Sequence, residues 1–167
     1  AKPGAAKMTP ASAPAPADVD DALLLRLDDD DAGNADALEA RHGGSFAYTG
    51  ALGWLQYTGQ CWADKGAAAS INLAAKDTLR LRRIAAVKAG KREALIAAAK
   101  PSSKNISAAV SLFRDMRTVD TASFDTERHL LNCANGVLDL KSGKLEAHEP
   151  SQLFTYCIET PYDASAS

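Results

Sequence analysis

The sequence has few aromatic residues, few cysteines and no long apolar run. Aromatic residues make up 6% of the 167 residues, and the cysteines are Cys61, Cys133 and Cys157. They are odd in number and lack CxxC spacing, which argues against a disulfide framework and indicates a reducing compartment. No apolar run approaches the roughly 20 residues of a membrane-spanning helix, and nothing resembles a signal peptide. The composition therefore favours a soluble globular protein without a membrane partner.

The N-terminal segment differs from the rest in composition. Residues 1–19 are mostly Ala, Pro and Ser with almost no bulky apolar side chains, so they cannot offset the entropy of ordering. The chain starts at Ala1 rather than Met and stops abruptly after residues 164–167, which indicates a piece of a longer protein. We therefore expect a flexible linker at 1–19, one domain at 20–164 and the start of a second linker at 165–167.

Charge is distributed unevenly, although the net charge is only −2. Residues 76–117 carry 11 Lys or Arg residues against three acidic ones, while the segments on both sides are acidic. Such a basic segment marks a surface for nucleic acid or an acidic partner, because Lys and Arg neutralise phosphates and give salt-dependent affinity. The alternative is a solvated helix surface that pairs with the acidic flanks. The DNA-binding candidates are Lys76, Arg80, Arg83, Lys88, Lys91 and Arg92.

Three helices are predicted in the Ala-rich middle of the chain. The first covers about residues 66–89, starts after an N-cap at Asp64 and ends at Gly90. The second covers 91–99, and the third starts after Ser102 or Ser103. The apolar stripe of the first helix is predicted to be Ile71, Ala74 or Ala75, Thr78, Leu81 and Ala85, and that of the third Ile106, Ala109, Val110, Phe113 and Met116.

β-structure is predicted on both sides of these helices. Residues 54–57 and 60–62 are expected to pair across a turn at Thr58-Gly59. The aromatic residues gathered around this hairpin either stack nucleic-acid bases or form the core of a small sheet, and the frequency of buried aromatic residues favours the core. They are Phe46, Tyr48, Trp54, Tyr57 and Trp62.

Residues 130–150 are predicted to form a three-stranded meander. Asn135-Gly136 provides residues for a two-residue turn, and residues 141–143 provide the next turn. Val137 and Asp139 are expected on one face of the middle strand, with Leu138 and Leu140 on the other. The predicted fold class is therefore α+β, with a small aromatic β-hairpin region, an Ala-rich basic helical middle and a C-terminal β-meander.

The acidic run at 28–31 has two interpretations. Asp28, Asp30, Gly33 and Glu39 fall at positions 1, 3, 6 and 12 of an EF-hand loop, but Ala32 offers no ligand at position 5. One interpretation is therefore a calcium-responsive module. The favoured one is the acidic start of a helix near residues 34–41, where carboxylates complement the positive helix end.

The sequence contains no motif that indicates a catalytic site. Gly143-Lys144 does not fit a phosphate-binding loop, because the spacing to Gly136 is too long and Leu145 replaces the Ser or Thr that would hold magnesium. No G-x-S-x-G motif is present. We therefore predict no catalytic, cofactor-binding or metal-binding residue.

One stretch is similar to a known family. Residues 130–150, LLNCANGVLDLKSGKLEAHEP, followed by Phe154-Thr155 and residues 161–163, resemble the domain before the superfamily 3 (AAA+) helicase module of phage, plasmid and poxvirus primase–helicases. The resemblance covers about residues 31–164. The positions that match the family and to which we assign a structural role are Gly33, Asn34, Trp54, Trp62, Asp64, Asn132, Asn135, Gly136, Asp139, Gly143, His148 and Pro150.

The resemblance implies a non-catalytic accessory domain of a replicative primase–helicase. Such a domain would help assemble a hexameric ring, contact its own helicase module and engage single-stranded or forked DNA in the cytoplasm of a bacterial host. ATP and magnesium are implied only for the helicase module beyond this chain, and any primase active site would lie before Ala1. The alternative is an oligomerisation scaffold with no DNA contact.

Overall fold

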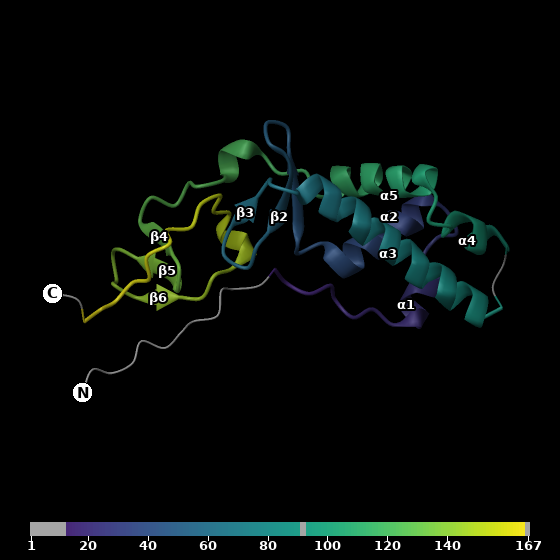
Figure 1. Cartoon of the computed structure of the whole chain (residues 1–167), viewed down its shortest axis with the longest axis horizontal. Coiled ribbons are helices and arrows are strands. Elements are labelled where there is room, and N and C mark those ends of the chain that lie inside the picture. The colour runs from purple at the N-terminus through teal and green to yellow at the C-terminus, as the bar shows by residue number, and fades with distance from the viewer. Residues whose placement is uncertain (1–12, 91–92, 166–167) are drawn as a thin grey trace. The chain divides into compact units, whose positions relative to one another are not determined.

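The computed structural model describes residues 13–90 and 93–165 and confirms the α+β fold class (Figure 1). Its strands form two antiparallel sheets, with the orders β1-β2-β3 and β4-β5-β6. The helices are α1 (Asp21–Arg26), α2 (Asp31–His42), α3 (Ala67–Lys88), α4 (Glu93–Ala98) and α5 (Ser103–Met116). The strands are β1 (Phe46–Thr49), β2 (Gly53–Tyr57), β3 (Trp62–Ala63), β4 (Leu130–Cys133), β5 (Gly136–Asp139) and β6 (Leu145–Glu146), with 3₁₀ turns η1 (Thr121–Ser123) and η2 (Pro150–Gln152).

The chain divides into two compact units. The helical unit consists of Ala15–Gln56 and Asp64–Thr121 and contains all five helices. The meander unit consists of Tyr57–Ala63 and residues 122–165, together with residues 13–14.

Helix α3 is the centre of the helical unit. It packs against α1, α2, α4 and α5, and Figure 1 shows it running alongside α2 and α5. The α5 helix begins where its pattern predicts, because the Ser102 side chain accepts a hydrogen bond from the Asn105 amide as an N-cap. The core between these helices and β1 consists of Ala35, Leu38, Phe46, Ile71, Ala75 and Phe113.

The aromatic residues of the helical unit form core contacts. Trp54 stacks on the buried Phe113 ring, with centroids 5.7 Å apart and planes inclined by 15°. Phe46 and Tyr48 pack edge-on against the same indole. Rings held in this way are not free to stack on bases, so the structure supports the core interpretation.

The predicted details of α3 need two corrections. The N-cap is Gly66, in a left-handed conformation, and Asp64 makes no side-chain cap. Leu81 is 42% exposed, while Leu79 and Arg82 lie on the buried side. The residues that α3 buries against its neighbouring helices are centred on Arg82. Leu81 lies about 100° round the helix from that centre and is therefore outside the buried side.

The acidic run starts a helix and does not form a calcium loop. The Asp30 side chain accepts a hydrogen bond from the Gly33 amide at 3.1 Å and thereby caps α2. Since α2 begins at Asp31, most of the segment that an EF-hand would need as a loop is helical. The calcium interpretation is therefore wrong, and the helix-start interpretation is supported.

The meander is present, but its first turn is shifted by one residue. Cys133 pairs with Gly136, so the two-residue turn is Ala134-Asn135 and Gly136 is the first residue of β5. A Cβ atom at Gly136 would overlap the carbonyl oxygen of Glu146 on β6, and this close approach places the glycine inside the strand. The predicted alternation is also incomplete, because Val137 and Leu138 are both buried.

His42 gives the helical unit a predicted pH dependence. Its ring is buried, and burial, followed by the nearby Arg41 charge, lowers its pKa from 6.5 to about 4. Between these pH values the unfolded chain binds more protons than the folded one, so stability falls as the pH falls. We expect a loss of about 2–3 kcal/mol from pH 7 to pH 4 through this residue, measured by urea unfolding. The His42→Leu variant should show a flatter pH profile, and an identical profile would contradict this assignment.

Candidate nucleic-acid interface on helix α3

The outward side of α3 carries a row of three predicted DNA-binding residues. Lys76, Arg80 and Arg83 are spaced i, i+4 and i+7 and therefore lie on one side of the helix. Lys76 and Arg83 are partly exposed and form no ion pair with any described residue. Arg80 is exposed and lies 3.4 Å from Asp77 one turn earlier, a solvated pair that leaves the guanidinium accessible.

The other three candidates are not part of this row. Lys88 lies about 120° further round the helix from Lys76 and is paired with Asp21 of α1 at 3.8 Å. Both of these side chains are exposed, so the pair is weak. Lys91 and Arg92 lie outside the described residues.

Large apolar side chains share the outward side of α3 with these cations. Leu73 is 62% exposed, Val87 57% and Ile84 50%. Together with Arg80 they follow the spacing i, i+7, i+11 and i+14, which is a single stripe. This surface is therefore amphipathic, with an apolar stripe beside the cations.

Arg82 belongs to the basic segment but is not part of the interface. It is fully buried, and its guanidinium donates to Asn34 Oδ1 (2.8 Å), to the carbonyl oxygens of Leu24 (3.3 Å) and Leu27 (3.0 Å), and to that of Asp28. Burial lowers its pKa, and the acidic residues around the start of α2 oppose that shift. Arg82 thus binds the α1–α2 segment to α3. No local sequence pattern indicates this role, because the carbonyl groups that accept from Arg82 come from α1 and the α1–α2 connection.

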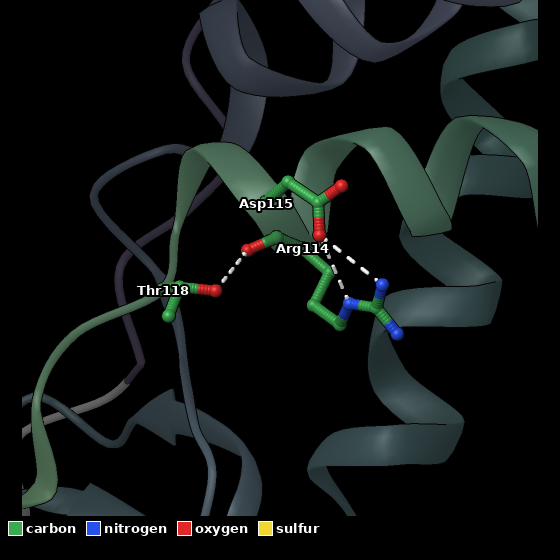
Figure 2. A network of polar contacts seen from close by, with 3 residues as sticks. All are labelled: Arg114, Asp115 and Thr118. Atoms are coloured by element: carbon green, nitrogen blue, oxygen red, sulfur yellow. Dashed lines mark hydrogen bonds and ion pairs between the residues drawn. The ribbon is translucent and has the colours of Figure 1, made fainter.

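Two further arginines of the segment also bind within the unit. Arg117 donates to the Phe46 carbonyl oxygen at 3.0 Å and approaches Glu39 at 3.4 Å. Figure 2 shows Arg114 bonded to Asp115, while its carbonyl oxygen accepts from Thr118. Part of the excess positive charge of the segment 76–117 therefore belongs to side chains that bond to other residues of the same unit.

Residues 35–167 match the family described as D5 N terminal like. This chain belongs to that family. Its members form the N-terminal domain of D5-like primase–helicases, which are superfamily 3 helicases linked to DNA replication. No curated protein matches the chain closely enough to be reported as a relative. None of the helices in the described part of the chain has the length and apolar content of a membrane span.

In this D5 N-terminal-like domain, the first family positions surround Arg82. A Cβ atom at Gly33 would overlap the Asp28 carbonyl oxygen and approach the Arg82 guanidinium, so only glycine leaves room for their contact. Asn34 accepts from Arg82 and donates to the Ala98 carbonyl oxygen at 2.9 Å. These two residues therefore position the buried arginine.

Family positions in the meander unit hold separate segments together. Asn132 is fully buried and donates to the carbonyl oxygens of Gln60 and Tyr156. Asn135 exchanges two hydrogen bonds with the Tyr162 backbone, at 2.8 and 2.9 Å. These side chains replace regular strand pairing at residues 153–158, which form an isolated bridge at Ile158 and no strand.

The remaining family positions of this unit act in a similar way. Trp62 Nε1 donates to the Pro150 carbonyl oxygen at 2.9 Å, and His148 Nε2 lies 2.8 Å from the Cys133 carbonyl oxygen. Asp139 accepts from the Lys141 amide and the Ser142 hydroxyl, and these bonds lower its pKa. They close the turn that Gly143 completes with φ = 70°. Asp64 lies exposed before α3.

Possible metal ligands are not clustered in the described part of the chain. Within residues 13–90 and 93–165, no group of three His, Cys, Asp or Glu side chains is placed to hold a metal ion. The exposed cations of α3 are therefore the candidate functional site, and their chemistry suits binding of anions.

Proposed function

We propose that this domain is a non-catalytic accessory domain of a primase–helicase that contacts the DNA backbone through α3 and helps assemble the ring. The observation that carries the proposal is the row of Lys76, Arg80 and Arg83 on the outward side of α3. Three cations spaced by about one helical turn can neutralise neighbouring phosphates without reading base sequence. ATP binding and hydrolysis would belong to the helicase module.

The triple variant Lys76→Ala, Arg80→Ala, Arg83→Ala is expected to bind DNA about 10- to 100-fold more weakly at moderate salt. Loss of three phosphate contacts should also reduce the slope of log K against log salt by about 2, since each contact to a single strand contributes about 0.7. The measurement is fluorescence anisotropy of labelled single-stranded and forked DNA at several salt concentrations.

A matched triple variant controls for net charge. Arg128, Lys141 and Lys144 are exposed cations of the meander unit, and replacing all three by alanine removes the same charge. This control should leave both the affinity and the salt slope nearly unchanged. If the two triple variants weaken binding equally, the interaction depends on overall charge, and α3 is not the interface.

The second candidate function is an oligomerisation scaffold without DNA contact. The exposed Leu73, Ile84 and Val87 favour it, because large apolar side chains on one helix face commonly mark a protein contact. This function requires concentration-dependent self-association in sedimentation velocity, with no DNA binding even at low salt. DNA binding by a monomer would exclude it.

A further inference from the structure

Cys61 and Cys157 are far apart in the sequence, but each follows a residue that bonds to the same side chain of the meander unit. Asn132 Nδ2 donates to the carbonyl oxygens of Gln60 (2.9 Å) and Tyr156 (2.6 Å). These are the residues directly before Cys61 and Cys157. Both carbonyl groups bond to one nitrogen atom of a fully buried amide, so the peptide groups that directly precede the two cysteines lie side by side.

The third cysteine differs from these two in exposure. Cys61 and Cys157 are partly exposed, whereas Cys133 is buried, and all three are free thiols. Burial raises the pKa of the Cys157 thiol, and the nearby Cys61 raises it further, ahead of Cys133. The accessible pair is therefore Cys61 and Cys157.

A buried phenol lies within electrostatic reach of the same two thiols. Tyr57 is only 5% exposed, and its hydroxyl has no hydrogen-bond partner among the described residues. Burial, Glu149, Cys61 and Cys157 raise its pKa to about 12. A buried hydroxyl without a partner is uncommon in folded proteins.

We propose that Cys61 and Cys157 form a two-thiol redox site that closes to a reversible disulfide with a diazene or peroxide oxidant. The two S–H bonds break and one S–S bond forms, while two protons and two electrons pass to the oxidant. A diazene is reduced to the hydrazine, hydrogen peroxide to two molecules of water, and an alkyl hydroperoxide to one molecule each of alcohol and water. Disulfides of this kind in reducing compartments are transient and redox-sensing. The bond would join the segment before β3 to the segment after η2.

The test is oxidation of the whole chain by diamide, followed by blocking of free thiols with iodoacetamide and peptide mass spectrometry without reduction. We expect a monomer with one blocked thiol, at Cys133, and a linked pair of peptides containing Cys61 and Cys157. The linkage should disappear with dithiothreitol, and the melting temperature should be higher in the oxidised form because the bond closes a loop of about 100 residues.

Three serine variants assign the bond. Cys133→Ser should still form the linkage, whereas Cys61→Ser and Cys157→Ser should leave both remaining thiols free to be blocked. The circular dichroism spectrum of each reduced variant establishes that it is folded. Three blocked thiols in the oxidised wild-type chain, a linkage through Cys133, or dimers alone would overturn the proposal.

Discussion

Replacing Arg82 by alanine is expected to lower the free energy of unfolding of the helical unit by about 4 kcal/mol. The substitution leaves three backbone carbonyl oxygens and the Asn34 amide oxygen without their donor, and it removes a large side chain from a closed site. Buried polar groups that lose a partner each cost about 1–3 kcal/mol. The measurement is urea unfolding followed by circular dichroism at 222 nm, because all five helices belong to this unit.

The adjacent Arg83 provides the matched control for Arg82. It carries the same side chain on the same helix but is partly exposed, and no described residue forms an ion pair with it. Arg83→Ala should therefore change stability by less than about 0.5 kcal/mol. Arg82→Lys keeps the charge but loses the planar fork of donors, so an intermediate loss is expected. Equal effects of Arg82→Ala and Arg83→Ala would contradict the structural role.

Replacing Asn132 by alanine is expected to destabilise the meander unit by about 3 kcal/mol. Asn132 is fully buried, and its amide nitrogen supplies donors to two carbonyl oxygens from separate segments. Without it, Gln60 and Tyr156 each have a carbonyl oxygen that loses this bond, and the segments lose their common attachment. The structure gives these segments little other regular pairing, so the loss should be cooperative.

The fluorescence of Trp62 measures this effect separately. Trp62 belongs to the meander unit and bonds to the Pro150 carbonyl oxygen, whereas Trp54 belongs to the helical unit. In a Trp54→Phe background, the Trp62 signal should show a lower urea midpoint when Asn132 is replaced. Asn72→Ala is the control, because that amide is exposed and bonds only within α3. An unchanged Trp62 unfolding transition in the Asn132→Ala variant would contradict the role of Asn132 in holding the two segments together.

The fold class was predictable because long periodic segments carry their own signal. The α5 pattern identified its buried face at Ala109 and Phe113, although Met116 of the same predicted stripe is 45% exposed. Of the two predicted N-caps, Ser102 is the one that the structure uses. The α3 stripe was partly wrong because an arginine gave no reason to expect burial, although Gly33 and Asn34 supply the space and the acceptor for it. Burial of Arg82 depends on carbonyl groups from α1 and the α1–α2 connection, which no local pattern reports.

A contact from a distant segment also determines the first turn of the meander, and local sequence does not reveal it. Asn135-Gly136 has the local preference for a two-residue turn, but the close contact of Gly136 with Glu146 fixes the register one residue earlier. The row of Lys76, Arg80 and Arg83 was predictable from helical spacing alone. The cysteine pair was not, because Asn132 joins segments that the sequence leaves far apart.

The salt dependence of DNA binding by the unmodified chain tests the central proposal most directly. Anisotropy of labelled single-stranded and forked DNA should report binding at low salt. The affinity should fall by at least about 10-fold on a fourfold increase in salt, as expected when about three phosphates are neutralised. Absence of binding at low salt, or binding that does not change with salt, would contradict a role for α3 in engaging DNA.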